Sequence, residues 1–120
     1  MEKPKIFESE YRFCRILWEN EPIRSTVLAK LCAEKLGWSK ATTYTVIKRL
    51  TERGVVKSEG AVVTSLISKE EAQAAQIDEL MEKTFAGSLP AFVAAFTRGR
   101  RLSAREAEEL KRMIDEYAEE

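Results

Sequence analysis

The most informative segment of this chain is Trp38-Ser-Lys-Ala-Thr-Thr-Tyr-Thr-Val-Ile-Lys-Arg-Leu-Thr-Glu-Arg-Gly-Val-Val56. Its pattern is typical of an amphipathic helix that ends at a glycine. At about 100° of rotation per residue, one stripe holds Thr43, Val46, Ile47 and Leu50. The other side carries Ala41, Tyr44, Thr45, Lys48 and, at the margin, Arg49. Small, hydroxylated and basic side chains suit the base edges of a DNA major groove, so the segment predicts a recognition helix. A solvated surface helix is the alternative.

The residues before this helix complete a helix-turn-helix pattern. Apolar side chains recur with helical spacing over residues 8–20, and Pro22 follows their end. A second helix is expected over residues 25–36, where Gly37 is the stop signal. Its apolar stripe comprises Val27, Leu28, Leu31, Cys32 and Leu36. Ser39 is the expected N-cap of the third helix. Two helices joined by a short glycine-containing turn, with another helix packed beside them, form this motif.

The residues after Gly54 predict a wing. Val55–Lys57 and residues 62–67 have the composition of two short strands around the turn-like tetrapeptide Ser58-Glu-Gly-Ala61. The expected fold class is therefore mostly α: a winged helix-turn-helix domain of three helices plus a short β-hairpin, followed by further helices. The hairpin is short, so its tip is expected to reach a phosphate rather than to read bases.

The net charge of zero divides into two halves of opposite sign. Residues 1–66 hold twelve Lys and Arg against eight Glu, a net charge of +4; residues 67–120 hold eight against twelve acids, a net charge of −4. Five cations and one acid, Glu52, lie within residues 40–57. That concentration of positive charge marks the expected phosphate-binding footprint.

The second half predicts three short helices. Ser68-Lys-Glu-Glu71 and Ser103-Ala-Arg-Glu106 both match a capping box, and Pro90 falls in a first helical turn. Three stripes in about fifty residues form only a marginal core, so we expect them to associate with a second copy. The alternative is that they pack on the first lobe. The expected domains are a winged helix over 1–67 and a dimerisation lobe over 68–120. The expected interface residues are Ile77, Leu80, Met81, Phe85, Leu89, Phe92, Val93, Phe96, Leu110 and Ile114.

Several function classes are disfavoured by composition. The chain has no histidine and no Cys-x-x-Cys pair, so we expect no metal site. It also lacks a Gly-rich phosphate loop and a nucleophile elbow, and we expect neither an enzyme nor a cofactor. Cys14 and Cys32 lie in apolar helical patterns and are expected to be buried thiols. No apolar run approaches the roughly 18 residues of a membrane span, so a soluble cytoplasmic protein is expected.

These residues resemble the BlaI/MecI/CopY family of penicillinase-type transcriptional repressors. The resemblance rests on Trp38-Ser39, Thr42, Thr45, Ile47, Arg49-Leu50 and Gly54, with Trp18 before them and Leu102-Ser103 and Glu108-Glu109-Leu110 after them. It covers nearly the whole chain. It implies a dimeric winged-helix repressor that binds inverted repeats in promoters and dimerises through its carboxy-terminal helices.

The resemblance and the helix pattern together give the candidate DNA-binding residues. Thr42, Thr45 and Arg49 occupy motif positions in or beside the DNA-facing helix. Lys40, Ala41, Tyr44 and Lys48 lie between the motif positions and are candidates for operator choice. Ser39 and Lys40 at the helix start, with Lys57 near the wing, are expected to contact phosphate.

The resemblance also bears on regulation. In beta-lactam-responsive members, a membrane-bound sensor protease signals cleavage of an Asn-Phe bond in the dimerisation lobe. The equivalent pair here is Ala95-Phe96, which lacks the asparagine and so puts that route in question. Copper-responsive members carry a cysteine-rich carboxy terminus, which this chain does not have. Two rival functions stay open at this point: a ligand-responsive winged-helix regulator, and a winged-helix interaction module that does not bind DNA.

Overall fold

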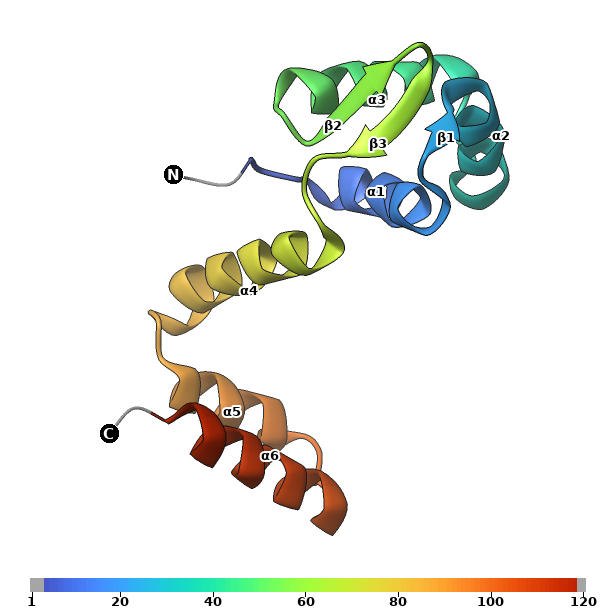
Figure 1. The fold of residues 1–120 in the computed structure, drawn as a ribbon. Coiled ribbons are helices and arrows are strands. Elements are labelled where there is room, and N and C mark those ends of the chain that lie inside the picture. Colours follow the sequence, from blue (N-terminus) through green and yellow to red (C-terminus); the bar gives the residue numbers. More distant parts are fainter. Residues whose placement is uncertain (1–3, 119–120) are drawn as a thin grey trace. The chain divides into compact units, whose positions relative to one another are not determined.

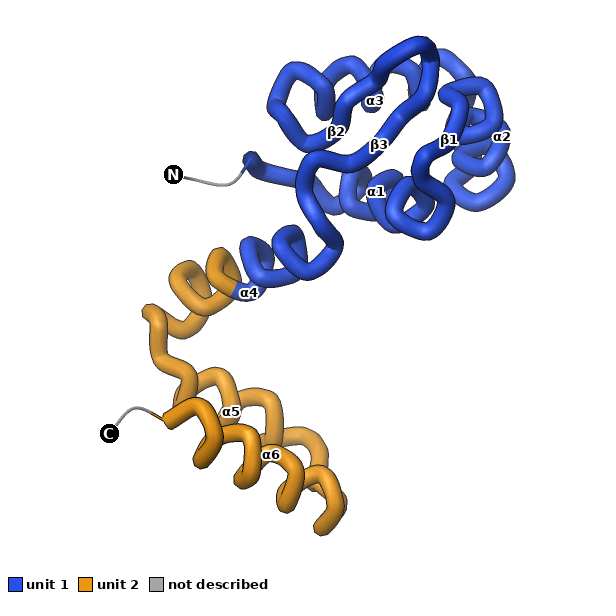
Figure 2. Tube along the Cα trace, viewed as in Figure 1, with its two compact units in different colours: residues 1–77 blue, residues 78–120 orange. Residues whose placement is uncertain are grey.

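A computed structural model of the chain describes residues 4–118 and divides into two compact units, residues 1–77 and 78–120 (Figure 2). The division falls inside helix α4 (Lys69–Phe85), ten residues beyond the boundary expected from the sequence. The reason is packing: the first turns of α4 bury Ala72, which joins Ile67 in the core of the first unit. The capping box that opens this helix does form, because the amide of Glu71 donates to Ser68 Oγ at 3.0 Å.

The first unit is a winged helix (Figure 1). Its helices and strands follow in the order α1 (Glu8–Asn20), β1 (Ile23–Arg24), α2 (Ser25–Leu36), α3 (Lys40–Glu52), β2 (Val56–Glu59) and β3 (Val62–Ser65). The strands form an antiparallel sheet in the order β1-β3-β2. All three helices of the motif and the hairpin were predicted, so the expected fold class is confirmed.

The sheet differs from the prediction in two respects. Strand β1 was not foreseen, and it adds a third strand by pairing Ile23 with Val63. The hairpin turn is also tighter than expected. It comprises Gly60 and Ala61, both with positive φ (56° and 63°), whereas Ser58 and Glu59 belong to β2. A two-residue turn of this kind matches the twist of its strands and leaves a short wing.

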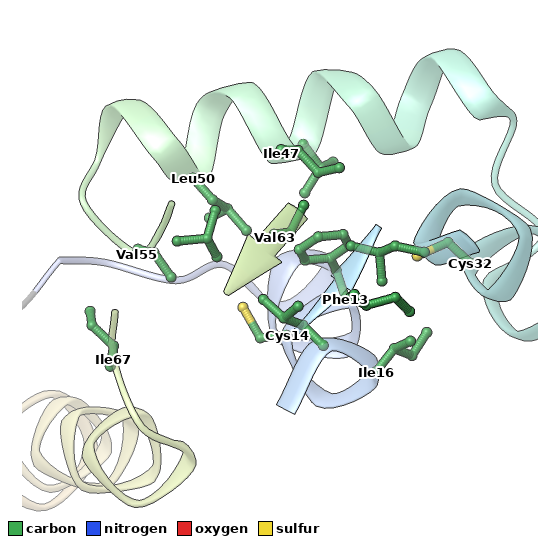
Figure 3. Close-up of a cluster of buried hydrophobic side chains, with 14 of the residues drawn as sticks. Phe13, Cys14, Ile16, Cys32, Ile47, Leu50, Val55, Val63 and Ile67 are labelled. Carbon is green, nitrogen blue, oxygen red and sulfur yellow. The ribbon is translucent and has the colours of Figure 1, made fainter. Parts of the chain in front are cut away.

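The core of the first unit lies between the three helices and the sheet (Figure 3). Phe13, Leu17, Leu28, Leu50 and Val63 are fully buried. The predicted inner stripe of α3 is confirmed, since its four side chains Thr43, Val46, Ile47 and Leu50 are all buried. One expectation for α2 is wrong. Val27 is 46% exposed, because the core-facing side of that helix is centred on Leu28 and Cys32.

Both cysteines are buried free thiols. Burial, with the nearby carboxylate of Glu10 adding to it, raises the pKa of Cys14 from 9.0 to about 12. Burial also raises the pKa of Cys32, although the neighbouring Thr43 acts in the opposite direction. The thiolate is the reactive form of cysteine, so burial and a raised pKa both lower the reactivity of these two thiols in the folded protein.

A prediction follows for alkylation. At pH 8 the native protein should react with iodoacetamide far more slowly than the denatured protein, as followed by mass spectrometry. Because the pKa of Cys14 is higher in the folded state than its ordinary value of 9.0, its contribution to stability is present below pH 9 and is lost as the pH rises toward 12. Rapid labelling of the native protein would contradict the burial of these thiols.

The second unit contains the end of α4 together with α5 (Leu89–Arg98) and α6 (Ala104–Tyr117). Ser88 caps α5, and the capping box of Ser103 with Glu106 opens α6 as predicted. The ring of Phe92 contacts those of Phe85 and Phe96, with centroids 5.5 and 6.1 Å away. No residue of α5 or α6 is buried. The large apolar side chains exposed in this unit are Leu80, Leu89, Val93, Phe96, Leu110, Met113, Ile114 and Tyr117.

Candidate nucleic-acid interface

The amino-terminal end of α3 has a side-chain cap. Ser39 Oγ accepts a hydrogen bond from the amide of Thr42 at 3.1 Å, which confirms Ser39 as the N-cap. The two hydroxyls of Ser39 and Thr42 also lie 2.9 Å apart. Both residues are exposed, so their hydroxyl groups lie at the surface beside the first turn of the helix. A helix start of this kind suits an anionic group such as a phosphate.

The outward face of α3 combines small, hydroxyl and basic groups. Ala41, Thr45, Lys48 and Arg49 are exposed, as predicted. The hydroxyl of Thr45 donates to the carbonyl of Ala41 at 2.9 Å. Its oxygen is therefore left as an acceptor, and its methyl group remains free for apolar contact. A methyl group, a hydroxyl acceptor and two long cations on one helix face match the chemistry of base edges and phosphates.

Tyr44 occupies a different position from the one the sequence indicated. It is only partly exposed, because its ring packs against the core at the edge of the outward face. The Nζ atom of Lys40 lies 5.8 Å from the centre of this ring, within the range of a cation–π contact. Tyr44 therefore borders the outward face and steadies Lys40, rather than projecting from the middle of the face.

Four of the five cations counted in this region are free to meet an anionic partner. Lys40, Lys48, Arg49 and Lys57 are exposed, and none of them forms an ion pair with a carboxylate within residues 4–118. Lys57 lies on β2 of the wing, whereas the other three lie on α3. The fifth cation, Arg53, is only partly exposed and is paired with Glu10. The positive footprint thus contains four side chains rather than five.

The sequence pattern does not indicate two contacts that hold the end of the hairpin and the segment after it. The carboxylate of Glu21 accepts hydrogen bonds from the backbone amide of Ser65 at 2.7 Å and from its hydroxyl. The indole of Trp18 donates to the carbonyl of Ile67 at 2.9 Å. Glu21 is the C-cap residue of α1 and contacts the last residue of β3, whereas Trp18 of α1 contacts Ile67 beyond that strand; both contacts span more than forty positions in sequence. No local pattern signals such pairs, because they depend on the tertiary fold.

A sequence model of the penicillinase repressor family matches residues 6–116. The chain belongs to the penicillinase repressor family. A penicillinase repressor of Bacillus licheniformis is 23% identical over 118 residues, which cover 95% of this chain and 92% of that protein. The family resemblance noted in the sequence is thus confirmed.

A solved structure has a related fold. The solution structure of the monomeric form of Bacillus licheniformis BlaI, in complex with the blaP half-operator, matches with a TM-score of 0.51 and 24% identity. The match covers 58% of this chain and 90% of that chain.

Membership of the penicillinase repressor family makes this chain a DNA-binding transcriptional repressor rather than an enzyme. Over residues 4–118, no helix has the length and apolarity needed to cross a membrane.

Proposed function

We propose that this repressor acts in the cytoplasm as a homodimer that binds an inverted-repeat operator, with each protomer placing α3 in the major groove. The main support for the proposal is that the two faces of α3 differ. One face is buried in the core and fixes the helix, and the other presents exposed cations and hydroxyl groups to solvent. A two-fold symmetric protein then matches the symmetry of two half-sites.

The side chains of this interface divide into two groups by chemistry. Ala41, Thr45 and Lys48 lie on the outward face of α3 and read base edges, with Tyr44 contributing from the border. Phosphate contacts fix the register of the protein on the duplex. The residues proposed for these contacts are Ser39, Lys40, Thr42, Arg49 and Lys57.

The proposed dimer forms through the second unit. Its exposed apolar side chains include Leu89 at 60%, Ile114 at 62% and Phe96 at 45%. A lobe whose helices α5 and α6 bury no residue in the single chain has too small a core to be stable alone. Association with a second copy removes these stripes from water, and each Å² of apolar surface buried contributes roughly 25 cal/mol.

The proposal is tested by DNA binding measured with fluorescence anisotropy. The full-length protein is titrated against the DNA upstream of its own gene and against a scrambled duplex, at several salt concentrations. Tight binding to the upstream DNA that tolerates salt better than binding to the scrambled duplex is expected. Equal and weak binding to both duplexes would contradict operator recognition at that site.

Replacing Lys48 with alanine should separate base reading from charge. Lys48→Ala is expected to lose about 1–3 kcal/mol of discrimination between the operator and a duplex altered at the contacted base. Lys111→Ala removes the same charge from an exposed position of α6 and serves as the matched control, since Lys111 is neither a proposed DNA-binding residue nor one of the expected dimer-interface residues. Unchanged affinity and base preference in Lys48→Ala would show that this side chain does not read the operator.

Proteolytic inactivation through a membrane sensor protease system is the proposed route of induction, and it requires a protease that accepts Ala95 where beta-lactam-responsive members carry asparagine. The bond between Ala95 and Phe96 lies in α5, where both side chains are exposed in the single chain. A protease binds its substrate in an extended form, so cleavage there requires local unfolding of α5. Mass spectrometry of the protein recovered from induced cells is expected to show a cut at this bond, and an intact chain in derepressed cells would exclude the route.

A further inference from the structure

Arg53 directly follows α3 and bridges three segments of the first unit. Its Nη1 atom donates to the backbone carbonyl of Lys5 at 2.9 Å, and its Nη2 atom pairs with the carboxylate of Glu10 on α1. The guanidinium carbon also lies 5.3 Å from the centre of the Phe7 ring. The side chain is only 29% exposed. Arg53 therefore joins the end of the recognition helix to α1 and to the segment before it.

Glu10 takes part in the same set of contacts. Its side chain is 7% exposed, and its second carboxylate oxygen accepts the amide of Phe7 at 2.9 Å. A buried carboxylate needs partners of this kind, because an unpaired charge away from water is strongly unfavourable. Arg53 supplies the compensating charge. A phosphate would have to compete with this buried carboxylate for the guanidinium, so Arg53 is poorly placed to act as a phosphate ligand.

The contacts of Arg53 bear on DNA binding because Arg53 lies in the chain between the recognition helix α3 and the wing. Gly54, which has a φ of 79°, and the buried Val55 connect it to β2. The amide of Val55 bonds to the carbonyl of Leu50, and its carbonyl accepts the amide of Leu66. A displacement at Arg53 would therefore change the position of α3 relative to Lys57 on the wing.

We propose that Arg53 is a positioning residue for operator binding, which acts through Glu10 and the carbonyl of Lys5 and makes no phosphate contact. The inference rests on the proposed DNA-binding function and adds to it a determinant outside the outward face of α3. Binding groups need support from neighbouring residues that hold them within about 0.5 Å of their productive geometry. The Arg53–Glu10 pair provides such support at the junction of recognition helix and wing.

Charge and position predict opposite results for Glu10→Gln. The substitution removes a negative charge, so electrostatics alone predicts tighter DNA binding. The positioning role predicts weaker operator binding by about tenfold, the scale typical when a supporting residue is removed. Arg53→Met should show the same loss. The slope of log affinity against log salt should not change, whereas loss of a true phosphate contact lowers that slope by about 0.9.

The test measures operator and scrambled-duplex binding by anisotropy over a range of salt, for the full-length protein and its variants. Glu8→Gln and Arg12→Met are matched controls, since both residues are exposed on α1 and their substitutions make the same charge changes. Glu10→Gln combined with Arg53→Met should weaken operator binding no more than either change alone, because both remove one interaction. Circular dichroism confirms that each variant is folded at the temperature of the titration.

Three results would overturn the inference. One is a reduced salt slope for Arg53→Met with tighter binding by Glu10→Gln; another is wild-type operator affinity in folded samples of both variants; the third is additive losses in the double variant. Arg53→Lys keeps the charge and provides the measurement if Arg53→Met does not fold, and it should lower operator affinity with an unchanged slope. A wild-type protein that fails to distinguish operator from scrambled DNA would instead count against the proposed function.

Discussion

Phe96→Asp is expected to convert the proposed dimer to a monomer and to weaken operator binding by about 10²–10⁴-fold. The loss follows from valency: two recognition helices held together bind two half-sites far more tightly than one helix binds one half-site. Phe96 is 45% exposed in the single chain and lies beside Phe92 on the apolar stripe of α5. An aspartate there would bury an unpaired charge in the dimer. Sedimentation velocity and anisotropy at micromolar protein measure both effects.

The matched control places the same charge on the other side of the helix. Ala94 is exposed and lies opposite the stripe of α5, so Ala94→Asp should leave the dimer and operator binding intact. Single half-site affinity should be equal for Phe96→Asp and the unmodified protein, because α3 is untouched. A dimer that persists in Phe96→Asp would show that this stripe is not the interface.

Leu50→Ala is expected to lower the free energy of unfolding by about 2–5 kcal/mol. Leu50 is fully buried on the inner face of α3, and its truncation leaves a cavity in addition to the lost burial of the side chain. Domains are commonly stable by only about 5–15 kcal/mol. For a unit of this size each kcal/mol lowers the Tm by about 4–8 °C. Thermal unfolding followed by circular dichroism should show a large drop.

Lys48→Ala provides the contrast on the same helix. Lys48 is exposed two residues before Leu50, so its replacement should change the Tm little. Leu50→Ala should behave oppositely, with lower stability but normal base preference in the fraction that remains folded. A Tm for Leu50→Ala close to that of the unmodified protein would contradict the packing of α3 against the core.

Much of the fold was predictable because its signals are local. The start of α3 follows from Ser39, and the starts of α4 and α6 follow from Ser68 and Ser103, whose side chains bond to amides three residues away. Helical spacing likewise identified the buried stripe of α3. Strand β1 has only two residues and pairs with β3 about forty positions later, so it is too short for a periodic pattern to indicate it.

The candidate site was predictable to a smaller extent, for the same physical reason. The outward face of α3 follows from the rotation of a helix, and its exposed cations were foreseen. Charge counting alone grouped Arg53 with them, because the sequence does not reveal its partner Glu10, 43 positions away. Tyr44 was assigned outward by angle, yet its large ring packs against the core at the edge of the helix. The helical angle predicts the direction in which a side chain points, whereas its burial depends on the neighbouring residues that the tertiary fold supplies.

Hydroxyl-radical footprinting of the upstream DNA shows directly whether a dimer reads an inverted repeat there. Two protected segments related by a two-fold axis are expected, with their centres one or more helical turns apart, about 10–10.5 base pairs per turn. Both segments should disappear together when the dimer is broken by Phe96→Asp. Uniform protection along the DNA, or no protection beyond that of a scrambled duplex, would contradict a dimeric repressor that reads an inverted repeat there through α3.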